Sequence, residues 1–366
     1  MRSGESAPWQ PAEAGRPPRV RVAVLGASGL AGGELVRLLA GHPAVELTYL
    51  GAKGAAGATL QEVHPHLAAL GWLGERQLEP LEPSAVAERA DVAFCSLPHR
   101  ASAELAPPLL EAGLRLIDLG GDFRLPAEDY PAWYGFEHPA PAWLEKAVYG
   151  LPELFGARLA GATLVANPGC YPTPVALGLA PLLSAGLLEP APVVVDGKSG
   201  VSGAGRGPSE ATGHAATEES VRPYGAPGHR HTPEMERAIE RAAGVQVPVA
   251  FVPHLVPAVR GVLTTCAARL GAGVTTEDLV GRLREAYADA PFVRVLPPGS
   301  HADTKRTRGS NLVELQALAD PRTGTAIVVG ALDNLVKGAA GQAVQNLNLL
   351  LGLPEATGLP TVAVYP

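Results

Sequence analysis

The hydrophobic pattern of the chain starts with a short apolar strand that runs into a glycine-rich turn. From Arg19 the run RVRVAVL is rich in β-branched residues, and Gly26, Gly29 and Gly32 follow it. From Leu30 onward, leucines recur at helical spacing through LAGGELVRLLAGH. Because the period of the apolar positions changes from that of a strand to that of a helix, the pattern predicts a strand, a glycine loop and a helix in succession.

Short apolar strands and helices then alternate over the first part of the chain. Strands are expected in VELTYLG, ADVAFCSL and LRLIDLGG, with a helix in ASAELAPPLLEAG between the last two. Nearly continuous apolar strands joined by helices are typical of a parallel sheet covered on both faces. We therefore expect an α/β, Rossmann-type domain over residues 19–164.

After residue 164 the pattern changes. A helix is expected from about Thr173, and the strands in VVVDGKSG, VAFVPHLVP and RGVLTTCAARL are separated by long glycine loops. These features predict an α+β catalytic and oligomerisation domain with a mixed or antiparallel sheet over residues 165–337. Residues 338–366 include a loop running into a long helix with small residues on one side, and we expect this segment to return to the first domain.

Composition narrows the class of protein. Residues 1–18 lack hydrophobic periodicity, which predicts a disordered tail. In the whole chain of 366 residues, 46% are apolar, which is enough to form the cores of two packed domains. A net charge of −7 argues against nucleic acid or an anionic membrane as partner, because phosphates require an excess of Lys and Arg. No apolar run approaches the roughly 20 residues that span a bilayer. Small-molecule chemistry by an unexported, cytoplasmic protein is expected.

The cysteines and histidines give little support for a disulfide or a metal. Cys95, Cys170 and Cys266 are odd in number, far apart and without a CxxC pair, which fits a reducing cytoplasm. His64 and His66 are the remaining metal candidates, but no acidic or cysteine partner lies at a recognisable spacing. We therefore expect no metal.

The glycine loop predicts a dinucleotide site. Gly26, Gly29 and Gly32 form the pattern GxxGxxG between a strand and a helix, which lets the backbone and the helix N-terminus approach a pyrophosphate. The alternative is a tight turn that binds no ligand. An NAD site usually has Asp or Glu at the end of the second strand, but that strand ends in LGAKGAAG. Lys53 is available instead, with Ser28 as a second anion contact, so the pattern favours NADP(H) unless Lys53 is merely solvated.

Cys170 is the candidate nucleophile. Cys95 and Cys266 lie inside apolar strands, where cysteine is normally an inert hydrophobe. Cys170 lies in NPGCYPT, between a strand and a helix, where a helix N-terminus stabilises a thiolate and backbone N–H groups can form an oxyanion hole.

Two histidines are candidate bases. His229 and His231 occur in GHRHTPE, just before a helix for which Thr232 is the expected N-cap; a simple surface turn is the alternative. A nucleotide loop, a reactive cysteine and a base together require chemistry that uses both a hydride and a covalent thioester. Reduction of an acyl phosphate, as in phosphorylating aldehyde dehydrogenases, satisfies both.

In these motifs the chain resembles the N-acetyl-gamma-glutamyl-phosphate reductase family, relatives of aspartate-semialdehyde dehydrogenase. The motifs occur in the family's order: GASGLAGGELVRLL, SLPH, DFRL, VYGLPEL, NPGCYPT, DGKSGVSGAGR, GHRHTPE, HLVPAVRG and DNLVKGAAGQAVQN. The similarity runs from Val20 to about Leu351. It departs from the family's usual SADFR, here GGDFR, and from the commoner ALPHG, here SLPHR.

The resemblance implies NADPH-dependent reduction of N-acetyl-L-glutamyl 5-phosphate to N-acetyl-L-glutamate 5-semialdehyde and phosphate, in arginine biosynthesis. Cys170 would be the nucleophile and His231, or alternatively His229, the general acid and base. Asn334 and Lys337 would approach the nicotinamide. The cofactor-binding residues implied are Gly26, Ser28, Gly29, Leu30, Ala31, Lys53, Ser96, Pro98, Ser199, Gly200 and Asn334.

The substrate of such an enzyme is anionic, so cationic and polar side chains are expected around it. The substrate-binding residues expected are Arg124, Asn167, Arg206 and Arg260. Arg260, in VPAVRG, is the preferred carboxylate clamp.

Two other functions stay open at the level of sequence. One is the same chemistry on a free or carrier-linked aminoadipyl phosphate, in lysine biosynthesis. The other is a non-catalytic, NADP-binding sensor. The resemblance also suggests a homotetramer or homodimer assembled through the sheet of the second domain.

Overall fold

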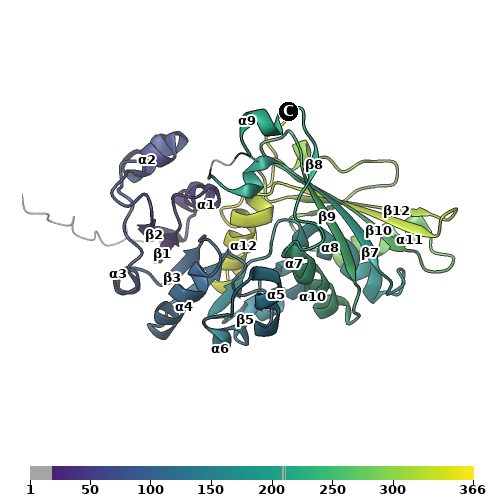
Figure 1. Ribbon diagram of the computed structural model, residues 1–366, viewed down its shortest axis with the longest axis horizontal. Coiled ribbons are helices and arrows are strands. Elements are labelled where there is room, and N and C mark those ends of the chain that lie inside the picture. The colour runs from purple at the N-terminus through teal and green to yellow at the C-terminus, as the bar shows by residue number, and fades with distance from the viewer. Residues whose placement is uncertain (1–18, 208–209, 211) are drawn as a thin grey trace, which may run out of the picture.

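The computed structural model describes residues 19–207, 210 and 212–366, so the expected tail over residues 1–18 lies outside the described part. Two sheets organise the chain and lie beside one another along the long axis of the molecule (Figure 1). One sheet is parallel and the other is mixed. The expected fold class, a Rossmann-type domain joined to an α+β domain, is confirmed.

The first sheet has six parallel strands in the order β2-β1-β3-β4-β6-β5. Its strands are β1 (Val20–Leu25), β2 (Val45–Gly51), β3 (Val92–Cys95), β4 (Arg115–Asp118), β5 (Ala147–Tyr149) and β6 (Leu164–Ala166). Because β1 lies between β2 and β3, the strand order reverses at β1, and the carboxyl ends of β1 and β3 border a crevice. The glycine loop follows β1, and Ser96 follows β3, at this crevice.

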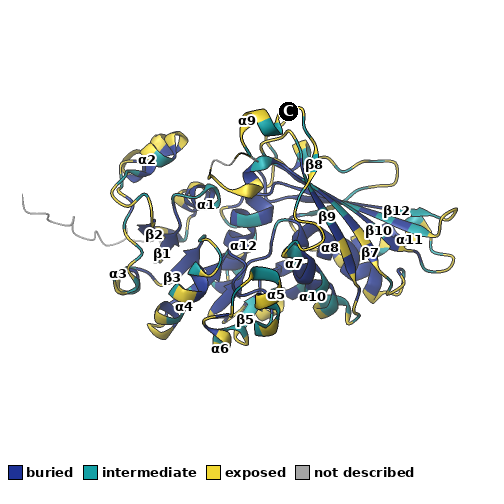
Figure 2. Cartoon of the chain, viewed as in Figure 1, coloured by how far each residue is buried: buried dark blue, intermediate teal, exposed yellow. Residues whose placement is uncertain are grey.

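Helices cover both faces of the parallel sheet with buried aliphatic side chains (Figure 2). Helices α1 (Leu30–Ala40) and α12 (Gly341–Leu350) share a core on one face, and α3 (Pro83–Arg89) and α4 (Ala101–Glu111) pack on the other. Short connecting helices are α2 (Leu60–Val63), η1 (Pro65–Leu73), η2 (Ala127–Asp129), α5 (Tyr130–Tyr134), α6 (Pro141–Leu144), α7 (Pro152–Phe155) and η3 (Gly156–Arg158).

The second sheet has seven strands in the order β11-β12-β13-β10-β7-β9-β8. The strands are β7 (Val193–Ser199), β8 (Arg222–Pro223), β9 (Val249–Leu255), β10 (Val262–Arg269), β11 (Val293–Val295), β12 (Val313–Asp320) and β13 (Thr325–Leu332). β7 pairs with β9 in parallel, whereas β10 is antiparallel to both β7 and β13.

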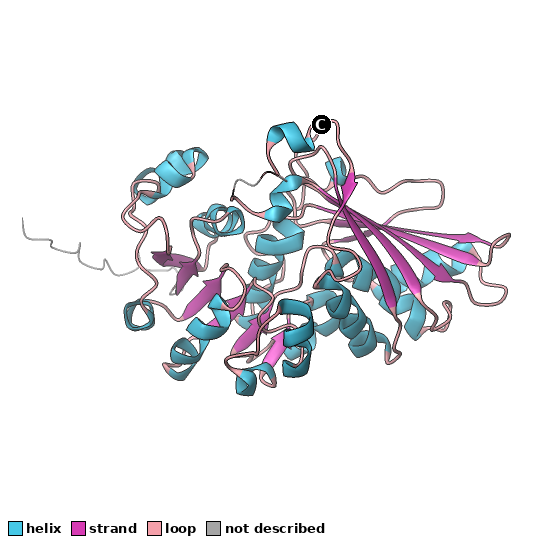
Figure 3. Cartoon of the chain, viewed as in Figure 1, coloured by secondary structure: helices cyan, strands magenta, loops and turns pink. Residues whose placement is uncertain are grey.

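Three helices pack on one face of this mixed sheet (Figure 3). They are α8 (Pro172–Ser184), α10 (His231–Ala243) and α11 (Thr276–Ala286). The alternate side chains of β7 point to the opposite face, where Val194 is 51% exposed. The remaining short helices are η4 (Val201–Ala204), α9 (His214–Thr217) and η5 (Thr304–Arg306).

The chain returns from the mixed sheet to the parallel one through η6 (Val336–Ala340), a π-helical turn, and α12. Ala343, Val344 and Leu347 of α12 are buried in the same core as Leu35 of α1. The segment thus packs against α1, the helix that follows the glycine loop. Within the described ranges, no helix is long and apolar enough to cross a membrane.

Candidate active site

The glycine loop makes a tight turn under the end of β3. Gly26 has a φ of +94°, and a side chain there would meet the Ser96 carbonyl oxygen at 2.1 Å. A side chain at Gly32 would meet the Gly26 carbonyl oxygen at 2.1 Å, so both glycines are required by the protein's own packing. At Gly29, the N-cap of α1, the nearest atom would lie 3.4 Å away. Space for a ligand is thus left beside the free N–H groups of the first turn of α1.

A cavity of about 650 Å³, here called the cofactor cavity, runs from this loop to Cys170. Nine of the expected cofactor residues line it: Gly26, Ser28, Gly29, Leu30, Ala31, Lys53, Ser96, Pro98 and Asn334. An anion-binding loop at one end and a thiol at the other match the two ends of a nicotinamide dinucleotide, whose pyrophosphate requires the loop and whose nicotinamide must reach the reacting carbon. The residues therefore fit such a cofactor.

The cationic side chains Lys53 and Arg206 both line the cofactor cavity. Lys53 follows β2 and is exposed. Arg206 reaches across from the second domain and donates to the Val63 carbonyl oxygen at 2.9 Å and to His64 Nδ1 at 2.7 Å. The sequence predicts that Arg206 binds the substrate. In the structure it lines the cofactor cavity instead, and it does not line the second cavity that begins at Cys170 and is described below.

Cys170 follows β6 and precedes α8, as its motif predicts. It is the only one of the three cysteines that is partly exposed, since Cys95 and Cys266 are buried in strands. Its surroundings are crowded: a side chain at Gly338 would lie 2.8 Å from Cys170 Cβ. The thiol therefore lies where the parallel sheet, α8 and η6 meet.

A second cavity of about 520 Å³, here called the substrate cavity, adjoins the first at Cys170. The residues common to both cavities are Cys170, Gly203, Ala204, Arg230 and His231. The remaining lining residues are Trp133, Tyr171, Ser199, Thr212, Arg222, Tyr224, Gly225, Gly228, His229 and Leu255. One thiol is thus reached from two sides, as a reaction between a cofactor and a second molecule requires.

The two histidines differ in position. His231 is the first residue of α10, with Arg230 as the N-cap, so the expected N-cap at Thr232 is wrong by two residues. His231 lines both cavities, and its Nε2 would lie 2.6 Å from a side chain at Gly169, next to Cys170. His229 lines only the substrate cavity, and its Nδ1 accepts the backbone N–H of His231 at 3.1 Å.

A buried hydrogen-bond network connects α10 to the loop that precedes Cys170. Glu234 is 1% exposed and accepts hydrogen bonds from Arg124 Nη1 (2.9 Å), the Tyr149 hydroxyl (2.8 Å) and the Gly169 N–H (2.8 Å). Because Glu234 lies one turn after His231, the same carboxylate positions the loop before Cys170 and the helix that carries His231. Arg124 also lines the cofactor cavity.

Replacing Glu234 with glutamine is expected to destabilise the protein by about 3 to 5 kcal/mol, because Arg124 would keep a buried charge without its counter-ion. Denaturant unfolding would measure the loss. Glu240→Gln is the matched control on the same helix, since Glu240 is far more exposed and should change stability by at most about 1 kcal/mol. Equal effects of the two variants would contradict the role assigned to Glu234.

The surroundings of Cys170 and His231 favour the neutral form of each side chain. Burial raises the pKa of the Cys170 thiol to about 11, although Arg124 and backbone N–H groups of Cys170 and Tyr171 act in the opposite direction. Burial, and then the positive charges of neighbouring groups, hold the pKa of His231 well below its usual value. Because a raised pKa leaves little free thiolate at neutral pH, we expect Cys170 to lose its proton as it attacks a substrate.

In the folded protein, iodoacetamide is expected to alkylate Cys170 well before Cys95 or Cys266, because the other two thiols are buried and their pKa values are raised further, that of Cys266 to about 12. A raised pKa leaves less thiolate at a given pH, so the rate should climb steadily between pH 7 and 10. Peptide mass spectrometry after a short exposure would identify the modified residue. Modification of all three cysteines at the same rate would contradict the selection of Cys170 as the reactive thiol.

Four of the expected cofactor- and substrate-binding residues do not line the cofactor cavity. Ser199 lines the substrate cavity, and Gly200 packs against the Val259 backbone, outside the lining residues of both. Asn167 is fully buried and donates to the Ala339 carbonyl oxygen at 3.2 Å. Arg260 pairs with Glu34 at 3.0 Å, and with Asp333, instead of clamping a carboxylate at either cavity.

Three further residues were missed or misplaced by sequence reasoning. His99, in the SLPHR segment, lines the cofactor cavity, and burial lowers its pKa to about 4. Tyr224 lines the substrate cavity and donates to the Tyr171 hydroxyl at 3.4 Å. Lys337 is fully buried away from the lining of the cofactor cavity, although we expected it near the nicotinamide. Only His99 carried a local signal, because it lies in the loop that follows β3, next to the glycine loop in the cofactor cavity.

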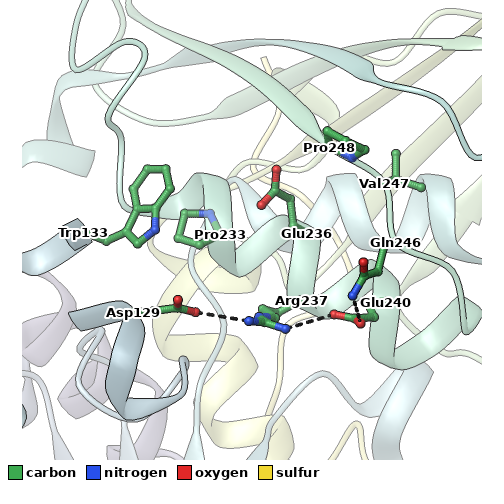
Figure 4. Close-up of a pocket in the computed structure, with 9 residues that line it drawn as sticks. All are labelled: Asp129, Trp133, Pro233, Glu236, Arg237, Glu240, Gln246, Val247 and Pro248. Carbon is green, nitrogen blue, oxygen red and sulfur yellow. Dashed lines mark hydrogen bonds and ion pairs between the residues drawn. The ribbon is translucent and has the colours of Figure 1, made fainter. Parts of the chain in front are cut away.

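A third hollow of about 290 Å³ lies on the outer side of α10 (Figure 4). Its Arg237 pairs with Asp129 at 3.6 Å and with Glu240 at 3.2 Å, and Gln246 donates to Glu240 at 2.6 Å. These polar groups satisfy one another, and the lining contains neither a thiol nor an imidazole. This hollow therefore offers neither a nucleophile nor a histidine base.

Comparison with known families defines the class of protein. The family described as semialdehyde dehydrogenase, NAD binding domain, matches residues 21–162, and the semialdehyde dehydrogenase dimerisation domain matches residues 170–334. Aspartate semialdehyde dehydrogenase II from Vibrio cholerae superposes with a TM-score of 0.70 at 18% identity, over 91% of this chain and 99% of that one. The enzyme from Candida albicans, solved with NADP, gives a TM-score of 0.66 at 15% identity, over 90% and 98%. The chain has the fold and domains of a semialdehyde dehydrogenase.

Closer relatives narrow this class to one family. The N-acetyl-gamma-glutamyl-phosphate reductase of Symbiobacterium thermophilum is 50% identical over 350 residues, 95% of this chain and 99% of that protein. The protein of the same name from Magnetococcus marinus is 47% identical over 348 residues, with the same coverage. The chain belongs to the N-acetyl-gamma-glutamyl-phosphate reductase family, which confirms the resemblance seen in its motifs.

Proposed function

We propose that this chain reduces N-acetyl-L-glutamyl 5-phosphate to N-acetyl-L-glutamate 5-semialdehyde and phosphate, with NADPH as reductant, in arginine biosynthesis. The observation that carries the proposal is the position of Cys170, the partly exposed thiol at which the cofactor cavity and the substrate cavity meet. His231 lines both cavities beside it. The names of the relatives supply the substrate, and the geometry supplies the course of the reaction.

Cys170 begins the reaction by attacking the acyl carbon of the acyl phosphate. A carbon–sulfur bond forms, the carbon–oxygen bond to phosphate breaks, and a thioester remains. His231 accepts the thiol proton and gives it to the departing phosphate. Backbone N–H groups at Cys170 and Tyr171, which already favour negative charge on the sulfur, stabilise the oxyanion formed at the carbonyl.

The cofactor supplies a hydride to the thioester carbonyl when it is bound, and the residues that would hold it are those of the glycine loop, Lys53, Ser96, Pro98 and Asn334. Asn334 is fixed for this purpose, because it accepts the Gly261 N–H at 2.7 Å and donates to the Ser202 hydroxyl at 2.9 Å. Release of the aldehyde leaves the Cys170 thiolate, which regains a proton from solvent through His231.

NADP(H) is the cofactor we propose, rather than NAD(H). Lys53 follows β2 at the position where an NAD enzyme would place a carboxylate, and Arg206 brings a second positive charge to the same cavity. Both charges favour the 2′-phosphate of the adenosine ribose.

The variant Lys53→Ala is expected to raise KM for NADPH by about tenfold and to leave KM for NADH nearly unchanged, because a charge-assisted hydrogen bond contributes about 1.5 to 3 kcal/mol. Steady-state kinetics with both cofactors would measure the ratio. Lys146→Ala, on the surface and outside both cavities, is the control. A parallel rise in KM for both cofactors would mean that Lys53 does not read the 2′-phosphate.

The reverse reaction gives the direct test of the proposed function. Purified protein would be mixed with NADP, phosphate and N-acetyl-L-glutamate 5-semialdehyde, and NADPH formation followed by absorbance. The aminoadipate homologue, one methylene longer, would be compared at the same concentrations. Phosphate-dependent turnover that prefers the glutamate compound is expected. Preference for the longer compound would move the chain to lysine biosynthesis, and no turnover with either would favour a sensor.

We further propose a homotetramer or homodimer, built on the face of the mixed sheet that α8, α10 and α11 leave uncovered. This sheet forms the region that matches the dimerisation domain, and Val194 lies exposed on it. Light scattering on the wild type and on Val194→Glu would test the interface, and a monomeric wild type would refute it. The three free thiols support a reducing, cytoplasmic location, which cell fractionation would check.

A further inference from the structure

Lys337 is a fully buried cation in the π-helical turn η6, and the reaction proposed above does not use it. Its Nζ lies 2.5 Å from Glu153 Oε1 and 2.7 Å from Gln345 Oε1, and the side chains of Lys337 and Glu153 are at most 1% exposed. Gln345 also donates to Glu153 at 3.0 Å. Placing this pair inside the protein has a desolvation cost that its mutual attraction barely offsets, so the pair calls for a role other than stability.

The same turn touches the nucleophile on its other side. Gly338, the next residue, has no room for a side chain because Cys170 Cβ would lie 2.8 Å away. The Ala339 carbonyl oxygen accepts a hydrogen bond at 3.2 Å from Asn167, three residues before Cys170. Gly338 and Ala339 both line the cofactor cavity. The turn η6 thus carries the buried ion pair at Lys337 and packs against Cys170 at the next residue, Gly338.

The conformation of η6 depends on contacts outside it. The N–H of Gly338 donates to the Asp333 carbonyl oxygen and that of Ala340 to the Leu335 carbonyl oxygen, both at 2.9 Å and both spanning five residues. Such π-helical turns are rare, occur mostly as single turns and are frequent at functional sites. Asp333 Oδ1 accepts the N–H of Leu335 and fixes the start of the turn. Lys337 is the second residue of the turn, and its side chain bonds to Glu153 and Gln345, which lie outside the turn.

We propose that Lys337 is a positioning residue, and that its ion pair with Glu153 holds η6 against Cys170 so that the sulfur is aligned with both cavities. The inference rests on the proposed role of Cys170 as nucleophile. A displacement of about 1 Å at a reacting group can lower a rate by about 10²-fold. A shift of η6 should therefore impair turnover more than binding.

The test separates positioning from stability. Lys337→Met alone leaves Glu153 as an unpaired buried charge and should lower Tm. The double variant Lys337→Met with Glu153→Leu removes both charges and should regain most of that Tm, because apolar side chains of similar volume replace a buried pair well. If the pair positions η6, kcat of the double variant stays about 10- to 100-fold below wild type, with KM for both substrates within about threefold.

Two further measurements keep the test decisive. Gly338→Ala presses on the same contact without touching the ion pair, and it should show the same fall in kcat at nearly constant KM. Iodoacetamide should alkylate Cys170 severalfold faster in the double variant, because η6 would pack less tightly against this residue. This rate needs no turnover, so it still tests the positioning if the wild type proves inactive on the proposed substrate.

The matched control is His42→Leu, which breaks a buried hydrogen bond to Asn348 of α12, 2.9 Å long, at the end of that helix away from η6. It should lower Tm without changing kcat or the alkylation rate. Wild-type kcat in Gly338→Ala and in the double variant, together with an unchanged alkylation rate, would overturn the proposal. A fall in kcat of equal size in His42→Leu would also overturn it, because a general loss of stability would then explain the fall in kcat.

Discussion

Cys170→Ala is expected to abolish phosphate-dependent turnover, with kcat lowered by roughly 10⁶-fold, the scale observed when the nucleophile of a covalent enzyme is removed. Neither of the other two cysteines can replace the nucleophile, because Cys95 and Cys266 are buried within strands and outside both cavities. NADPH should still bind, because the glycine loop and Lys53 lie at the other end of the cofactor cavity.

The measurement combines turnover in the reverse assay with NADPH binding by fluorescence. Cys266→Ala is the matched control, since it removes a buried thiol of the mixed sheet and should retain full activity with a small loss of stability. If Cys170→Ala kept a tenth of wild-type activity, a thioester could not lie on the reaction path, and direct attack on the acyl phosphate would have to replace it.

His231→Gln is expected to lower kcat by about 10² to 10⁴-fold, the usual contribution of a general acid and base, whereas His229→Gln should lower it less than about tenfold. His231 lines both cavities, while His229 lines only one and acts on His231 through its Nδ1. The larger effect of His229→Gln would reverse this assignment.

A pH profile distinguishes loss of the base from general damage. Without His231, Cys170 must ionise on its own, and its pKa is raised to about 11. A raised pKa means that the active thiolate becomes more abundant as pH rises, so the residual activity of His231→Gln should climb about tenfold per pH unit between pH 7 and 10. The wild type should climb far less steeply over that range. Parallel profiles would mean that His231 does not take the thiol proton.

The local pattern of the sequence determined the helices and strands, and also those features of the site that lie within a single segment of the chain. The strand VELTYLG is β2 over Val45–Gly51, and the helix after the glycine loop begins at Leu30. The glycine loop, the position of Cys170 before a helix and the burial of Cys95 and Cys266 follow from neighbours in the chain, because hydrophobic period and turn residues are local properties. The parallel and mixed sheets followed from the order of those elements.

Only the tertiary structure decided which distant residues meet. Arg260 and Arg206 are both cations next to a glycine, yet one pairs with Glu34 and the other reaches His64, and no local pattern separates them. Glu234 and Lys337 gained their roles from partners more than one hundred residues away, Arg124 and Glu153. The choice between His231 and His229 likewise depended on where α10 begins relative to Cys170. Buried charge requires a partner in space, and sequence spacing does not encode that partner.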